Sequence, residues 1–179
     1  MRLPALRFAP VLVAVALAGP GATPAAALSG QASCAGAGAH PTSARAAAFT
    51  GATLCLLNRE RAQHGPRPLR SNALLALAAW RHSRDMVRRG YFAHGDLVGR
   101  LARVGYLRGR RSWTVGENIA WGSGPRATPR SIVSAWMRSA GHRANILNGR
   151  FREVEIGIVS GAPVPQMRKA ATYTTDFGG

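Results

Sequence analysis

The chain is short of cysteine, lysine and acidic residues, and each shortage narrows what it can be. Two cysteines among 179 residues allow at most one internal disulfide and exclude a Cys-rich scaffold or a metal ribbon. Seven acidic residues face 24 basic ones, all arginine except Lys169, so the formal net charge is +17. A hydrophobic content of 46% is ordinary for a globular protein and excludes wholesale disorder. The length fits one domain of roughly 100–150 residues.

No apolar run reaches the ~20 residues that a membrane-spanning helix requires. The stretch 11–18 comes nearest, and prolines interrupt the chain on both sides of it. Arginines precede this stretch and Ala25-Ala26-Ala27 follow it, which gives the three parts of a secretory signal peptide. We therefore predict a signal peptide at residues 1–27, export of the protein, and no transmembrane span. An uncleaved N-terminal anchor is the alternative.

Export decides how the two cysteines are interpreted. Cys34 and Cys55 both follow the predicted signal peptide, and thiols outside the cytoplasm can oxidise. A bridge between them would tie the Ala/Gly-rich lead-in, residues 28–47, to the first helix, and the chain-entropy model gives such a crosslink about 3 kcal/mol. We predict this disulfide, with two unrelated buried thiols as the alternative.

The spacing of apolar residues predicts helices flanking a small antiparallel sheet, an α+β fold. One helix spans residues 42–63, a second spans Ser71–Arg89 with Ser71 as its N-cap, and a third begins at Thr128-Pro129. Strands are expected at 117–121, 154–159 and 170–177, the last two as an antiparallel hairpin. The aromatic residues expected in the core are Trp80, Tyr91, Phe92, Trp121 and Trp136.

Three segments rich in turn residues and aromatics each contain one histidine or one acid of interest. His94, Glu117 and His142 lie one in each segment. Imidazole beside a carboxylate can serve proton transfer or a divalent metal site, but no pair has the close spacing of a helical metal motif. Hydrogen bonding is the alternative role for each. His82, on the apolar face of the second helix, is expected to be a hydrogen-bonded core histidine, and His64 to be exposed.

The motifs form a series of seven segments, in chain order Asn58-Arg-Glu-Arg-Ala62, Pro68-Leu69, Trp80-Arg-His-Ser-Arg-Asp-Met86, Gly90-Tyr-Phe-Ala-His94, Gly105-Tyr106, Gly116-Glu-Asn-Ile-Ala120 and Ser139-Ala-Gly-His-Arg-Ala-Asn-Ile-Leu147. This order resembles the CAP superfamily of cysteine-rich secretory proteins, antigen 5 and pathogenesis-related proteins, and its short bacterial secreted SCP-like branch. The resemblance covers about Ala48 to Phe177. It implies a CAP domain over residues 48–179, folded as a three-layer α–β–α sandwich with a small central antiparallel sheet and a cleft lined by two histidines and two acids.

Carried over one position at a time, the resemblance makes His94 and His142 the two cleft histidines and Glu117 the first cleft acid. The position of the second acid holds Ser139, so the tetrad is at best a triad with a hydroxyl group. Glu155 stands where the family's strand usually has glycine, and we expect it at an exposed edge rather than in the cleft. The remaining cleft residues in this interpretation are Asn118, Arg143 and Asn145.

Three classes of function stay open at this point. Two imidazoles and one carboxylate would suit Zn²⁺, with His94 and His142 as candidate ligands, although the arginines oppose a cation. Glu117, Ser139 and His142 would be the candidate catalytic groups of a cell-envelope hydrolase or protease.

We favour the third class, a secreted monomeric protein of the bacterial envelope or medium that binds a small or lipid-like ligand or an envelope component without catalysis. Its charge would attract anionic envelope polymers or lipids, whereas no pattern for specific nucleic-acid recognition is present.

Overall fold

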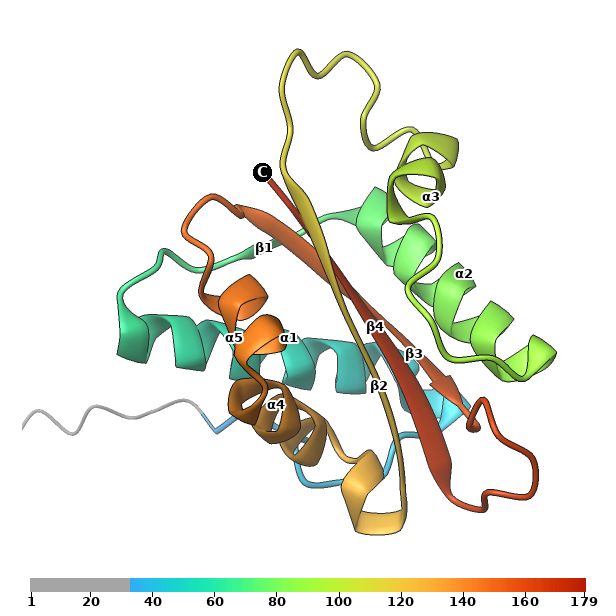
Figure 1. The fold of residues 1–179 in the computed structure, drawn as a ribbon. Coiled ribbons are helices and arrows are strands. Elements are labelled where there is room, and N and C mark those ends of the chain that lie inside the picture. The colour runs from blue at the N-terminus through green and yellow to red at the C-terminus, as the bar shows by residue number, and fades with distance from the viewer. Residues whose placement is uncertain (1–32) are drawn as a thin grey trace, which may run out of the picture. The chain divides into compact units, whose positions relative to one another are not determined.

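Four strands form a sheet at the centre of residues 33–179, the part of the chain that the computed structural model describes: β1 (Arg70–Ser71), β2 (Val115–Ser123), β3 (Glu153–Ser160) and β4 (Ala170–Gly178). The strand order is β1-β3-β4-β2, so the C-terminal strand lies inside the sheet (Figure 1). β4 runs antiparallel to both neighbours, which confirms the predicted hairpin. The short β1 adds a parallel pair with the start of β3, which the sequence did not indicate. The predicted signal peptide lies outside the described residues.

Helices cover both faces of this sheet, as the three-layer prediction requires. α2 (Ala73–Arg89) and α3 (Leu97–Arg103) lie on one face (Figure 1). The other face carries α1 (Ala46–His64), α4 (Pro129–Arg138) and α5 (Ala140–Leu147). Short 3-10 turns precede α1 and α4, at Ser43–Arg45 and Gly124–Ala127. Among residues 33–179, no helix is both long and apolar enough to cross a bilayer.

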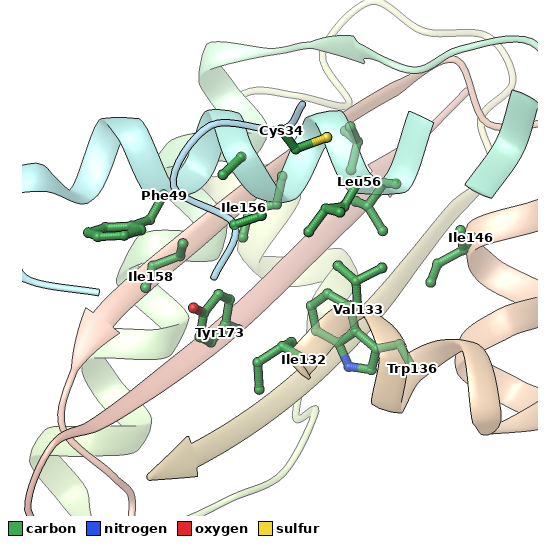
Figure 2. Packing of buried hydrophobic residues seen from close by; sticks show 14 of the residues in the cluster. Cys34, Phe49, Leu56, Ile132, Val133, Trp136, Ile146, Ile156, Ile158 and Tyr173 are labelled. Atoms are coloured by element: carbon green, nitrogen blue, oxygen red, sulfur yellow. The ribbon is translucent and has the colours of Figure 1, made fainter. Parts of the chain in front are cut away.

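The main apolar core lies between the sheet and the group α1, α4 and α5 (Figure 2). Trp136 of α4 is at its centre, 1% exposed, and donates its indole N–H to the Ile119 carbonyl at 3.2 Å. Its ring stands edge-on to Tyr173 of β4, with centroids 6.5 Å apart. Apolar side chains from α1, α4 and β3 pack in the same core: Phe49, Leu56, Ile132, Val133, Ile156 and Ile158.

The predicted disulfide is present, and it joins Cys34 in the lead-in to Cys55 of α1. Two of the expected core aromatics, in contrast, are on the surface: Trp80 is 41% exposed and Phe92 is 45% exposed. Trp80 lies where α2 approaches β3, and the guanidinium of Arg84 stacks over its ring at 4.5 Å. Phe92 lies in the connection after α2, where its side chain remains exposed. The prediction was wrong for these two residues.

Helix boundaries differ from the predicted ones at two capping positions. Ser71 belongs to β1, and the N-cap of α2 is Asn72, whose side-chain oxygen accepts the backbone N–H of Leu74 at 2.9 Å. Asp96 caps α3 by accepting the N–H of Gly99 at 2.7 Å. Neither α3 nor α5 was predicted, because a helix of seven or eight residues shows too few turns of apolar periodicity.

The face of β4 under α2 is polar and yet buried. Ser83 of α2 places its hydroxyl 2.8 Å from both the Gly157 carbonyl and the Thr174 hydroxyl. This close approach requires the glycine in β3, because a Cβ atom at Gly157 would overlap the backbone of Ala79 and Trp80. The helix therefore rests directly on the strands, with polar groups between them.

Replacing Gly157 with alanine should destabilise the fold by about 1–3 kcal/mol, since the added methyl group must push α2 off the sheet. Gly51 in α1 is the matched control, because nothing lies within 4 Å of a Cβ placed there. Gly51→Ala should be neutral or stabilise by about 0.5–1 kcal/mol. Urea unfolding of both variants measures the difference, and a Gly157→Ala protein as stable as the parent would contradict this packing.

Candidate functional site

Glu117 of β2 is the centre of a cluster of basic groups. Its side chain is 2% exposed, and its Oε1 accepts a hydrogen bond from His94 Nδ1 at 2.7 Å. Its Oε2 pairs with the guanidinium of Arg100 and lies 3.8 Å from His82 Nε2. One buried carboxylate therefore collects groups from α2, from α3 and from the connection between them.

Local structure explains why these groups meet. Gly90 ends α2 in the left-handed region at φ 67°, which turns the chain back towards the sheet. The cap at Asp96 then starts α3, and Arg100 follows within its first turn. Arg100 also donates to the His94 carbonyl at 2.6 Å. The guanidinium thus fixes both the backbone and the ring of His94 relative to Glu117.

The family motif residues on the other side of β2 have a structural role. The Asn118 side chain donates to the His142 carbonyl at 3.0 Å. Asn145 of α5 donates to the Asn118 side chain at 2.9 Å and to the Glu117 carbonyl at 3.1 Å. Successive strand residues point to opposite faces, so Glu117 and Asn118 connect β2 to the two helical layers. These bonds hold α5 against the strand edge beside the cluster.

Within residues 33–179, Glu117 has no side-chain hydrogen bond to His142, Ser139 or Arg143. His142 is half-buried, and its ring centroid lies 6.5 Å from that of Trp136. Burial lowers the pKa of His142, and the nearby His94 ring lowers it further, so His142 is neutral at pH 7. Ser139 is half-buried at the joint between α4 and α5, and Arg143 is exposed. The structure thus brings His94 and Glu117 into direct contact, with His142 close by.

Asp176 is a site residue that the sequence analysis missed. It is directly opposite Glu117 in the β2–β4 register and is fully buried. As a carboxylate it has no hydrogen-bond donor within residues 33–179. Burial raises the pKa of Asp176 well above its ordinary value, and the adjacent Glu117 charge raises it further, against the opposing effect of Arg100. Burial and the Glu117 charge therefore both favour the protonated form of Asp176.

His82 also belongs to this cluster. The prediction of a hydrogen-bonded core histidine is confirmed, because His82 is 3% exposed and its Nε2 lies 3.0 Å from the Ala93 carbonyl. Burial lowers the pKa of His82, which outweighs the opposing effect of Glu117. The ring is consequently neutral, and it contributes packing and a hydrogen bond to the cluster, but no charge.

Glu155 is not at an exposed edge, as expected, but is buried at 7% exposure. Its Oε2 accepts the Ser71 hydroxyl at 2.6 Å, and its Oε1 accepts the N–H of Ile156 at 3.1 Å. In register it lies on the other side of Asp176 from Glu117. The expectation was wrong because β1 and α2 cover this part of β3. Three carboxyl groups therefore share one row across the sheet.

The donor set does not fit the divalent metal that the sequence left open. Within residues 33–179, no three His, Cys, Asp or Glu side chains are grouped so that they could hold an ion. Glu117 already has Arg100 on one oxygen and His94 on the other, so a guanidinium provides the cation of this cluster.

Comparison with known proteins decides the family. Residues 54–169 match the model of the cysteine-rich secretory protein family, CAP. The chain belongs to this family. Over 110 residues it is 37% identical to the uncharacterized protein YkwD of Bacillus subtilis strain 168, covering 61% of this chain and 42% of that protein. Over 112 residues it is 34% identical to the uncharacterized membrane protein YlbC of the same strain, covering 59% and 30%. The chain thus spans less than half the length of these two CAP relatives.

Solved structures agree with the CAP fold. An extracellular protein containing an SCP domain, from Bacillus anthracis Ames, superposes with a TM-score of 0.60 at 27% identity, over 76% of this chain and 43% of that one. A Borrelia burgdorferi outer surface protein gives 0.55 at 14% identity, over 70% and 87%. A cysteine-rich secretory protein of Staphylococcus aureus Mu50 gives 0.54 at 20% identity, over 76% and 40%. The last two support the fold alone.

The substitution Asp176→Asn should stabilise the protein increasingly as pH rises. The pKa of Asp176 is higher in the folded state than in the unfolded state. Its contribution to the free energy of unfolding is therefore fully present below the unfolded-state pKa and is lost as pH rises through the folded-state pKa. An amide carries no charge and keeps a donor for Glu117. We expect similar melting temperatures at pH 5 and a gain of about 1–3 kcal/mol by pH 9.

Glu155→Gln is the matched control for this measurement, because Glu155 already has hydrogen-bond donors. It should show no gain that grows with pH. Thermal unfolding across this pH range compares the two variants with the parent. An Asp176→Asn protein whose disadvantage grows with pH would show that Asp176 is a stabilising carboxylate.

Proposed function

We propose that this CAP domain is exported and binds an envelope component at the His94 surface, without hydrolysing it. The observation that carries the proposal is the fixed and accessible ring of His94. Its side chain is 54% exposed, and Glu117 accepts a hydrogen bond from Nδ1. The Nε2 atom is then the ring atom that remains for a hydrogen bond with the ligand.

Binding is favoured over hydrolysis by the state of Glu117. Its carboxylate is buried and has a partner on each oxygen, so it cannot reach a substrate itself. It orients His94 rather than His142, which leaves a Ser139–His142 pair without an orienting acid. The hydrolase alternative therefore has the residues but not the hydrogen bonds that it needs.

Export is supported by the signal-peptide pattern of residues 1–27, by the disulfide, and by the extracellular SCP-domain protein among the structural neighbours. The excess of arginine over acidic residues favours anionic polymers or lipids of the envelope as the binding material.

Retention of the purified protein on insoluble bacterial cell-wall material tests the proposal. His94→Ala should weaken retention about threefold to tenfold, the range expected for one lost hydrogen bond. His64→Ala is the control, because His64 is exposed and its Nδ1 bonds only the Glu60 carbonyl of its own helix. Equal retention of the parent and of both variants would overturn the proposal.

The same incubation distinguishes binding from hydrolysis, because soluble wall fragments are measured in the supernatant. We expect no release above a protein-free blank. Release that the parent produces and Ser139→Ala abolishes would establish the hydrolase alternative instead.

A further inference from the structure

A pocket of about 620 Å³ lies between α2 and α3, next to the His94 surface. Gly95 and Arg100 belong both to its wall and to the segment that positions His94. Its wall is unusually rich in one residue type, with six arginines: Arg81, Arg84, Arg88, Arg89, Arg100 and Arg103. Two helices therefore direct cationic residues towards one concave space.

Helical periodicity places these arginines together. Arg81, Arg84 and Arg88 follow the i, i+3, i+7 spacing of one face of α2. Arg100 and Arg103 are three residues apart on α3 and face them across the pocket. Like charges at such spacing destabilise a helix unless counter-charges are near. The helices are held in this arrangement by an apolar contact that includes Leu75, Ala78 and Leu101.

The acidic residues of the wall do not neutralise this group. Asp85 accepts the Tyr91 hydroxyl at 2.6 Å and pairs with Arg89 at 3.5 Å. The pKa of Tyr91 is raised to about 12, by burial first and then by Asp85, so its hydroxyl keeps its proton. Asp96 is used as the cap of α3. The wall therefore keeps a clear excess of positive charge.

Four of the arginines have no acidic partner in the described part of the chain, namely Arg81, Arg84, Arg88 and Arg103. In addition, the Nε atom of Arg100 is buried and has no hydrogen-bond acceptor within residues 33–179. The basic composition alone does not explain this gathering. A second pocket of about 420 Å³, between α1 and β3, has no arginine in its wall.

We propose that the α2–α3 pocket binds a phosphomonoester. Planar guanidinium groups form paired hydrogen bonds with phosphate oxygens, and a dianion with three terminal oxygens can engage arginines of both helices at once. The pocket is larger than a phosphate ion, and Tyr91, Ala78 and Val104 offer apolar surface to the organic part of the ester. A neutral or cationic ligand would leave the arginines uncompensated.

This inference rests on the proposed function only in that both sites belong to one continuous surface. It names the chemical group that the envelope component would carry. A phosphomonoester of this kind occurs as a free ester or as a lipid headgroup, and the experiment separates these sources.

Calorimetric titration of the full chain with glycerol 3-phosphate at low, constant ionic strength is the direct test. We expect saturable binding and a Kd that rises at least about tenfold in Arg81→Gln/Arg88→Gln, since two charge-assisted contacts are lost. The matched control is Arg126→Gln/Arg130→Gln, which removes the same charge from exposed positions outside the pocket. Its Kd should change less than about twofold.

Equal weakening in both double variants would mean that only net charge matters and would overturn the proposal, as would an absence of saturable binding. Circular dichroism of each variant confirms that helix content is kept. A negative result in this titration does not contradict the His94-dependent retention on cell-wall material. The titration contains no wall material, and its variants change only arginines of α2.

Vesicles of phosphatidylcholine with and without phosphatidic acid identify the source. Binding to phosphatidic acid vesicles that Arg81→Gln/Arg88→Gln abolishes supports a lipid headgroup. Binding of glycerol 3-phosphate without binding to these vesicles supports a free ester. Vesicle binding that both double variants retain equally would contradict a role for the pocket.

Discussion

The ion pair between Glu117 and Arg100 is the interaction on which the rest of the site depends. It places a charged group of α3 on a buried carboxylate of β2, and the same guanidinium bonds the His94 backbone. Removing one partner of a buried pair leaves the other charge unsatisfied and costs about 3–5 kcal/mol. The second carboxyl group, on Asp176, has no cation partner within residues 33–179, and burial together with the Glu117 charge raises its pKa, which favours the uncharged form. One arginine therefore suffices for two adjacent acids, and the His94 ring acquires a fixed orientation.

The use of the few acidic residues explains the character of the surface. Glu153 accepts hydrogen bonds from Tyr106 and Asn72 and pairs with Arg110, and burial opposes, but does not outweigh, the lowering of the pKa of Glu153 by these groups. Asp85, Asp96, Glu117 and Glu155 are likewise bonded to groups of the same chain. Most arginines consequently have no acidic partner within residues 33–179, and four of these line the pocket between α2 and α3. The pocket therefore attracts anions because the acidic side chains are bonded to other groups of the chain, and not only because the net charge is positive.

Ordered motifs in the sequence were enough to predict the family and the three layers. The hairpin was predicted from the pattern of the last two strands, and the disulfide from two cysteines in a chain expected to be exported. The motifs were also enough to bring His94 and Glu117 to one place. Asp176 was missed because it lies outside the motif segments, and nothing in the sequence placed it beside Glu117. The face of β4 that carries it is covered by α2, so the polar side chains there are buried in the structure. The arginine pocket was missed because α3 was not predicted, and the arginines of two separate segments gave no sign that they would face each other.

A crystal structure of the full chain, grown without phosphate or sulfate and then soaked in glycerol 3-phosphate, tests the central claim most directly. The claim is that Arg100 is committed to Glu117 while the remaining arginines of the pocket are available to an anion. The account predicts phosphate density between α2 and α3, in contact with Arg81 or Arg88, with the Glu117–Arg100 pair unchanged. Two results would contradict it. In the first, Arg100 leaves Glu117 and contacts the phosphate in the soaked crystal; in the second, Glu117 has no guanidinium beside it in the unsoaked crystal.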